Sequence, residues 1–316
     1  MPLITLFTAP KQFTNPHIAM IQRNAILSWM KLGPEVEVAM VGNETGMAEF
    51  AAECGVRHLA QVRCNAQGTP LVSSIFRLGN EISDSPLLAY SNADILFLPD
   101  LLSAARKIQA QVERFLVVGQ RWDLDVTRLL DLSAGWEGRL AEDVRQRGKR
   151  HRAMGSDYFI YPRGCFERIP DFAIGRSGWD NWMIYEGRRL GLDVIDASEA
   201  ITVIHQNHDY SHLPNNEPPY RLPETTENIR LAGGMRSIFL LRDANRRMTS
   251  EGRLVGQEVT PERVVREVEL FPLVRLHSAF LGQVFYSLFH PQKGYLELRA
   301  WLAGKIKGKE VALPKH

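Results

Sequence analysis

The first 125 residues alternate between short apolar runs and segments with helical spacing, and this alternation limits the fold more than any other feature of the chain. Apolar runs of strand length lie at residues 3–7, 35–44, 56–59, 86–92 and 115–123, and helical spacing recurs at 17–33, 47–55 and 69–83. Strands that alternate with helices predict a parallel sheet covered by helices on both faces. The expected fold class is therefore α/β, with a mostly parallel central sheet.

The remainder of the chain is expected to divide near residue 222. Residues 132–154 are charged and interrupted by glycines, which predicts a surface loop or a short helix. A strand at 156–162, a tight turn entering a helix at 175–191, and short strands after residue 191 complete the first unit. Residues 223–248 are predicted to be helical, and so is the apolar, basic tail that follows. We therefore expect one domain over 1–222 and a helical C-terminal extension over 223–316.

Composition excludes several classes of protein. The net charge is +2, with 38 basic and 36 acidic residues, so no broad basic field is available for nucleic acid. The three cysteines are far apart in sequence and show no CxxC spacing, which argues against a disulfide framework and against a cysteine zinc site. The N-terminus shows no basic leader, and no window has the length and hydropathy of a membrane span. These features favour a cytoplasmic protein.

Polar residues follow several of the predicted strands, and ligands collect at the carboxyl ends of strands in parallel sheets. The most informative of these ends is the sequence SNAD, which places Asn92 and Asp94 directly after a buried strand. The glycine-rich phosphate loops GxxxxGK[ST] and GxGxxG are absent. Oxygen ligands in an Asn-x-Asp pattern offer another way to hold a diphosphate, because they can fix a hard divalent cation that bridges phosphate oxygens. The same pattern is also common in ordinary turns.

This ordered set of strand ends resembles the GT-A glycosyltransferases, in particular their family 2-like members. In that family the strand before the donor site ends in Asp-x-Asp, and SNAD is similar to a variant with an amide in first place. The resemblance implies a Rossmann-like GT-A domain with a donor half over about 1–125 and an acceptor half over about 155–215. It implies that Asp94 binds manganese or magnesium and that Asn92 supplies a carbonyl oxygen or bonds the ribose.

The resemblance also implies positions for the nucleotide-sugar. Thr8 and Pro10 lie in a loop similar to the one under the nucleotide base, and Glu44 lies where the family often places an acid on the base or ribose. Thr69 and Ser73 match the helix start that approaches the nucleotide.

On the acceptor side, the sequence GWDNWM is similar to the family's acceptor turn, which implies Asp180 as the catalytic base. Asp157, Trp179 and Asn181 are the expected acceptor-binding residues. As a helix N-cap, Asp180 would have an ordinary structural role instead.

Many metal-dependent members use a histidine as the last metal ligand, and the sequence VIHQNHDYSH offers His205, His208 and His212. Histidine is a frequent metal ligand, but it is also a common hydrogen-bonded structural residue. Only some of the three can face a metal if they alternate along a strand.

The implied reaction moves a sugar from a UDP- or GDP-linked donor to an acceptor hydroxyl. With Asp180 as base the reaction inverts the anomeric centre, although a retaining enzyme could share every donor-side feature. Arg121, or the basic residues Arg147, Lys149 and Arg150, would balance the charge of the departing diphosphate. Two alternatives remain: a sugar nucleotidyltransferase, and a catalytically degenerate GT-A-like binding subunit, suggested by the amide at position 92.

The expected acceptor is a glycan, a lipid-linked sugar or a small molecule. The apolar tail with basic residues after residue 272 is expected either to pack against the domain or a second copy, or to lie on a membrane interface at the inner face. The oligomeric state stays open.

Overall fold

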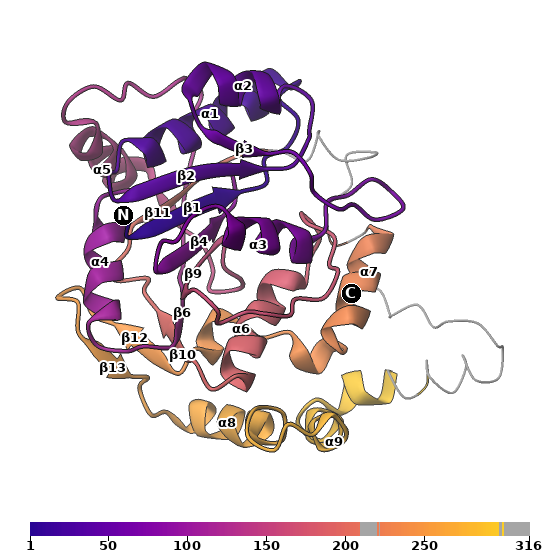
Figure 1. Cartoon of the computed structure of the whole chain (residues 1–316). Coiled ribbons are helices and arrows are strands. Elements are labelled where there is room, and N and C mark those ends of the chain that lie inside the picture. Colours follow the sequence, from indigo (N-terminus) through magenta and orange to yellow (C-terminus); the bar gives the residue numbers. More distant parts are fainter. Residues whose placement is uncertain (209–219, 221, 297–298, 300–316) are drawn as a thin grey trace.

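The computed structural model describes residues 1–208, 220, 222–296 and 299 of the chain. Its centre is a nine-stranded sheet in the order β13-β12-β10-β6-β9-β4-β1-β2-β3 (Figure 1). Five of the eight neighbouring pairs are parallel, so the prediction of a mostly parallel α/β sheet is confirmed. The strands are β1 (Ile4–Thr8), β2 (Val36–Val41), β3 (Arg57–Leu59), β4 (Leu87–Ser91), β6 (Phe115–Val118), β9 (Tyr158–Pro162), β10 (Asp193–Asp196), β12 (Arg246–Met248) and β13 (Leu254–Gly256).

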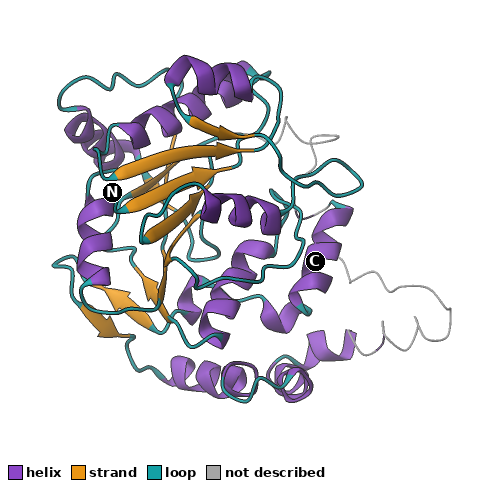
Figure 2. Cartoon of the chain, in the orientation of Figure 1, coloured by secondary structure: helices purple, strands orange, loops and turns teal. Residues whose placement is uncertain are grey.

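Helices cover both faces of this sheet (Figure 2). The first face packs against α1 (Pro16–Met30), α2 (Met47–Cys54), α4 (Asp100–Gln109) and α5 (Trp136–Arg147). The second face packs against α3 (Val72–Glu81), α6 (Trp179–Arg189), α7 (Pro223–Ala232) and α8 (Pro261–Val274). Successive side chains of a strand point to opposite faces. Accordingly, Leu6 belongs to the first core and Phe7 to the second.

A second, four-stranded sheet lies beside the main one in the order β5-β11-β7-β8. Its strands are β5 (Ile95–Phe97), β7 (Trp122–Leu124), β8 (Lys149–Arg150) and β11 (Val203–Gln206). Strand β11 runs antiparallel to β5 and parallel to β7. Residues more than a hundred positions apart in sequence therefore become neighbours here, which positions the candidate site.

The C-terminal segment mixes helices with two strands. Residues after 222 form helices α7, α8 and α9 (Ala279–Phe289) and two short 3-10 turns. The prediction that the helical stretch continues to residue 248 is wrong, because β12 and β13 form an antiparallel pair that extends the main sheet next to β10. Figure 1 shows α8 and α9 together along the lower edge of the molecule.

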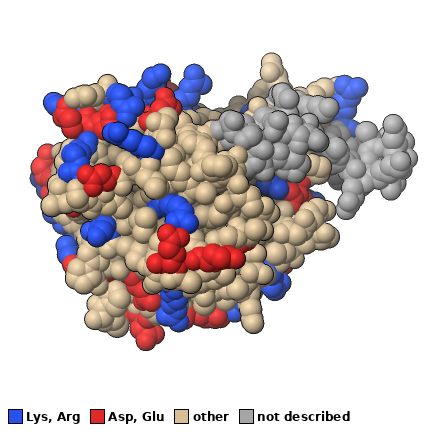
Figure 3. Space-filling view, turned by 90° about the horizontal axis from the view of Figure 1, so that it is seen from above, with Lys and Arg blue, Asp and Glu red and all other residues tan. Residues whose placement is uncertain are grey.

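Charge is spread without a dominant sign over the face shown in Figure 3, where basic and acidic side chains are interspersed. This agrees with the near balance of charges in the sequence. None of the described helices combines the length and the apolar composition that a membrane span needs.

Candidate functional site

Asp94, His205 and His208 form one cluster at the end of β4. The Nε2 atom of His208 is 3.1 Å from Oδ2 of Asp94, and Nε2 of His205 is 4.0 Å from the same oxygen. One ligand atom from each residue lies within 4.8 Å of the others. One carboxylate and two imidazoles are a donor set that divalent transition metals accept, so this cluster could bind a metal ion.

Strand pairing explains how the cluster forms. Asp94 immediately precedes β5, and the antiparallel register of β5 with β11 places His205 opposite Ile95. The parallel register of β11 with β7 places His205 opposite Asp123, whose Oδ1 lies 3.5 Å from Nδ1 of His205. A carboxylate behind the second nitrogen of a ligating histidine commonly fixes its orientation. Asp123 occupies that position.

The electrostatics of the cluster suit a cation. Burial alone would raise the pKa of Asp94, but the hydrogen bond from His208 and the charges of His205 and Lys11 hold that pKa well below its ordinary value. Burial lowers the pKa of His205, which favours the neutral imidazole that a metal requires. Oδ1 of Asp94 and Nδ1 of His205 are buried and have no hydrogen-bond partner among the described residues. An acceptor atom buried in this way is costly unless a ligand satisfies it.

The ammonium group of Lys11 lies beside the cluster. Its Nζ atom lies 3.9 Å from Oδ2 of Asp94 and 3.4 Å from Nε2 of His208. Desolvation lowers the pKa of Lys11 more than the charge of Asp94 raises it. Sequence analysis did not single out this residue. Its position could have identified it, because Lys11 follows β1 at the same sheet edge as Asp94.

Asn92 belongs to a hydrogen-bond chain beside the cluster. Its amide nitrogen donates to Oδ1 of Asp157 at 3.1 Å, and its carbonyl oxygen accepts from the hydroxyl of Tyr90 at 3.1 Å. Arg121 donates from Nη1 to both oxygens of Asp157 and from Nε to Asp123, so it links this chain to the residue behind His205. The amide at position 92 therefore satisfies a donor and an acceptor at once, which an aspartate could not do.

We expect Asn92→Asp to destabilise the protein by about 1–3 kcal/mol, because it removes a donor and sets two carboxylates against each other. Chemical denaturation measures this loss, with Asn92→Ala as the control that removes the amide without adding charge. Metal-dependent nucleotide binding should not improve in Asn92→Asp. Tighter metal binding in that variant would mean that position 92 is a weakened metal ligand instead.

A cavity of about 870 Å³ opens over the cluster. Of the residues expected to bind the nucleotide-sugar or the metal, it is lined by Pro10, Glu44, Thr69, Asn92, Asp94, Arg121, His205 and His208. Asp157, expected on the acceptor side, also contributes to this lining. The sequence-derived positions therefore converge on one cavity from both halves of the domain.

Two residues expected at the donor site do not line this cavity. Thr8 is fully buried in β1, and its Oγ1 has no partner among the described residues. Ser73 is on the outer side of α3, where its hydroxyl donates to Asp171. His212 lies outside the described residues.

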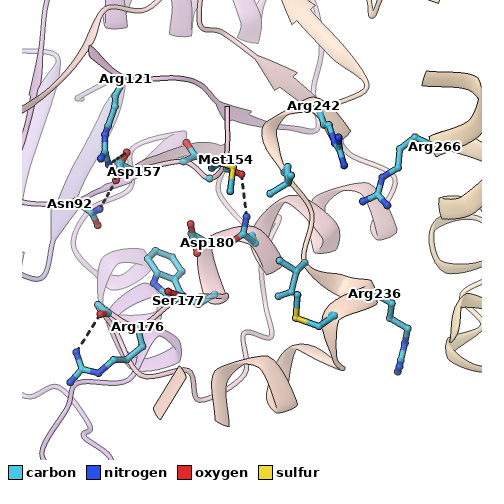
Figure 4. Close-up of a pocket in the computed structure, with 18 of the residues that line it drawn as sticks. Asn92, Arg121, Met154, Asp157, Arg176, Ser177, Asp180, Arg236, Arg242 and Arg266 are labelled. Atoms are coloured by element: carbon cyan, nitrogen blue, oxygen red, sulfur yellow. Dashed lines mark hydrogen bonds and ion pairs between the residues drawn. The ribbon is translucent and has the colours of Figure 1, made fainter. Parts of the chain in front are cut away.

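Asp180 lines a second cavity, of about 600 Å³, which shares Asn92, Arg121, Asp157, Gly175 and Arg176 with the first (Figure 4). Burial, helped by the charge of Asp157, raises the pKa of Asp180 to about 6 despite backbone hydrogen bonds at the start of α6. Gly155 approaches this carboxylate so closely that a Cβ atom would lie 2.3 Å from Oδ2 of Asp180. Only glycine fits at position 155 without displacing Asp180. The carboxyl group is thus held at the cavity wall with a pKa of about 6, close to the pH range in which it could exchange a proton.

Trp179 and Asn181, on either side of Asp180 in sequence, contact other parts of the protein. Trp179 is buried and meets Tyr90 edge to face, with ring centroids 5.2 Å apart. Asn181 donates from its amide to the carbonyl oxygens of Met154 and Phe239, which fixes the cavity wall. Both residues line the second cavity.

The basic residues of the 145–152 stretch lie apart from both cavities. Arg147 pairs with Asp143, and the guanidinium of Arg150 stacks over Trp122. Instead, the second cavity receives residues that sequence analysis did not assign to any site: Arg236, Arg242, Arg266, Tyr286, His290 and Lys293. No local motif marks these residues, because tertiary packing alone brings α8 and α9 to this wall.

No protein-family model matches the chain, and no curated protein matches it by sequence. Among solved structures, the chain is similar to S. aureus TarS 1-349, with 9% identity, a TM-score of 0.41, and coverage of 74% of this chain and 64% of that one. It is also similar to S. aureus TarS 1-349 in complex with UDP-GlcNAc, with 12% identity, a TM-score of 0.45, and coverage of 74% and 66%. The chain spans slightly less than two thirds of each of these structures.

Proposed function

We propose that the protein is a glycosyltransferase that uses a divalent cation and moves a sugar from a UDP- or GDP-linked donor to an acceptor hydroxyl. One observation carries this proposal: the cavity over the Asp94, His205 and His208 cluster joins the cavity of Asp180 through a shared wall. A metal-binding group and a carboxyl of raised pKa thus face two adjoining spaces. That is the arrangement expected when a donor and an acceptor meet.

The residues of the cluster fit a cation through one carboxylate oxygen of Asp94 and the two imidazoles. When bound, manganese or magnesium would stabilise the negative charge that grows on the departing diphosphate. Lys11 would add a positive charge of the chain at the same place. Arg121 is occupied by Asp157 and Asp123, and we assign it to positioning those two carboxylates instead of binding phosphate.

Asp180 would accept the proton of the acceptor hydroxyl as its oxygen forms a bond to the anomeric carbon and the bond to the diphosphate breaks. A carboxyl with a pKa of about 6 is ionised at neutral pH and remains basic enough to take this proton. Attack from the side of Asp180 inverts the anomeric centre. Pro10, Glu44 and Thr69 would contact the nucleoside from the far side of the larger cavity.

The acceptor is a glycan, a lipid-linked sugar or a small molecule. A lipid-linked acceptor would match peripheral contact with the inner face of a membrane through α8 and α9, where Phe280, Leu288 and other large apolar side chains are exposed. The other two acceptor types need no such contact.

A thermal-shift panel tests the proposal. Nucleoside diphosphates and diphosphate-sugars are each added with manganese, with magnesium and with chelator, because a ligand specific for the native state raises Tm. We expect one base to give a shift that depends on metal. A shift only with nucleoside triphosphates, followed by pyrophosphate release with a sugar phosphate, would indicate a nucleotidyltransferase. Binding without any transfer or donor hydrolysis would indicate a degenerate binding subunit.

A further inference from the structure

The wall of the Asp180 cavity farthest from the metal-binding cluster carries three cations that form no ion pair with any described residue. Arg236 lies in the 3-10 turn Met235–Ser237, Arg242 in the turn Leu241–Asp243, and Lys293 after α9. Arg236 donates to the amide oxygen of Gln283 at 2.8 Å, a neutral partner. Arg242 and Lys293 are exposed at the cavity rim.

The other cations of this cavity are neutralised by nearby acids. Arg266 pairs with Asp243 and Glu269, Arg176 pairs with Glu224, and Arg121 pairs with Asp157 and Asp123. The other arginines that line this cavity therefore each pair with a carboxylate. Arg236, Arg242 and Lys293 depart from this pattern, so among the described residues their side of the cavity carries an excess of positive charge.

The position of these residues separates them from the donor. They line the Asp180 cavity but not the larger cavity over Asp94. In Figure 4, Asp180 lies between the Arg121–Asp157 pair on one side and Arg236, Arg242 and Arg266 on the other. A diphosphate held at Asp94 would thus be at the opposite end from Arg236, Arg242 and Lys293. Their charge is therefore available to a second ligand.

We propose that the acceptor carries an anionic group, a phosphate or a carboxylate, that binds to Arg236, Arg242 and Lys293 while its reacting hydroxyl lies at Asp180. This inference rests on the proposed function, because it takes the Asp180 cavity as the acceptor site. Guanidinium groups bind carboxylate and phosphate oxygens through paired hydrogen bonds, and lysine adds a point charge. The carboxylate of Asp180 would repel an anionic acceptor, and the three cations offset this repulsion. A neutral acceptor would not need them for this purpose.

The test compares binding of glucose 6-phosphate, glucuronate and glucose to the full chain by calorimetry. Manganese and an excess of the nucleoside diphosphate found in the thermal-shift panel are present, so that the donor cavity is filled. We expect at least one of the two anionic sugars to bind about tenfold or more tightly than glucose, since charge-assisted hydrogen bonds are about twice as strong as neutral ones. Whichever anion binds better identifies the preferred group.

The double variant Arg236→Gln and Arg242→Gln should lose this discrimination, and Arg253→Gln, an exposed arginine outside both cavities, should keep it. Equal binding of all three sugars in the wild type, or unchanged discrimination in the double variant, would overturn the inference. Neither result affects the proposed function while nucleotide and metal still bind. Conversely, if no nucleotide gives a shift in the thermal-shift panel, the proposed function is rejected, and the sugars are then compared without nucleotide. Discrimination that the double variant loses would in that case show that these cations bind an anionic sugar in a protein of another function.

Discussion

Asp180→Asn should reduce sugar transfer by about 10²- to 10⁴-fold, the range that a general base contributes, while nucleotide binding stays intact. The side chain keeps its shape, and the Asp94 cluster lies in the other cavity, so the donor site is not altered. Initial rates of nucleoside diphosphate release, measured at saturating donor, give the loss. An exposed carboxylate away from both cavities, Asp84, supplies the control variant Asp84→Asn, which should retain full activity.

The same substitution should stabilise the protein at neutral pH. The pKa of Asp180 is raised to about 6, so the folded state binds the proton more tightly than the unfolded state does. Stability therefore falls as pH rises from about 4 to about 6, and the full penalty is present above pH 6. Replacing the carboxylate with a neutral amide should therefore raise the free energy of unfolding by up to about 3 kcal/mol at pH 7.5, which an increase in Tm would show.

The rate of the wild-type protein should depend on pH through the ionisation of Asp180. Below pH 6 the log of kcat should rise with a slope near one as Asp180 ionises, and it should level off above pH 7. Asp180→Asn should abolish this limb. Full activity in Asp180→Asn, or a pH profile that the substitution leaves unchanged, would assign the proton transfer to another group.

Asp94→Ala should remove metal-dependent nucleotide binding, because Asp94 is the only carboxylate of the described three-residue cluster. We expect the affinity for the nucleoside diphosphate with manganese to fall about 100-fold or more, toward the value measured with chelator. Titration calorimetry in the presence and absence of metal measures this effect. Asp171→Asn, at a surface carboxylate that pairs with Arg63, is the matched control.

Asp94 variants should also differ from Asp180 variants in the sign of their effect on stability. The pKa of Asp94 is lowered, so its ionised form stabilises the fold above its ordinary pKa, and this contribution is lost as pH falls through the folded pKa. Asp94→Asn should therefore destabilise the metal-free protein by about 1–3 kcal/mol. Stabilisation by Asp94→Asn, or metal-dependent nucleotide binding that survives Asp94→Ala, would contradict the assignment of this cluster.

Local sequence patterns predicted much of the sheet and its helices. The helix of residues 16–30 has its cap at Asn15, whose Oδ1 accepts from the backbone amides of His17 and Ile18, and Pro16 at its first turn. For strand β9, local patterns predicted the strand itself but not its place or direction in the sheet. Its apolar run predicted a strand, but nothing local indicates that it lies antiparallel between β4 and β6. Strand direction depends on long-range pairing.

In the candidate site too, some residues could be predicted from local sequence and others depend on long-range packing. Asn92, Asp94 and Asp180 follow strands or begin a helix, so their place at one sheet edge follows from topology. The meeting of His205 with Asp94 depends on the second sheet, whose register across a hundred residues has no local signature. Arg236, Arg242 and Lys293 reach the cavity through packing of the C-terminal helices, and charge alone does not distinguish them from solvated surface residues.

The most direct test is a crystal structure with manganese and the nucleoside diphosphate, with anomalous diffraction data collected at the manganese absorption edge. We expect one anomalous peak beside Oδ1 of Asp94, within ligand distance of His205 or His208, with the diphosphate oxygens completing its coordination. The nucleoside would then lie in the larger cavity near Pro10 and Glu44. A nucleotide bound elsewhere, or one bound in this cavity with Lys11 in place of any metal, would contradict the metal-dependent mechanism.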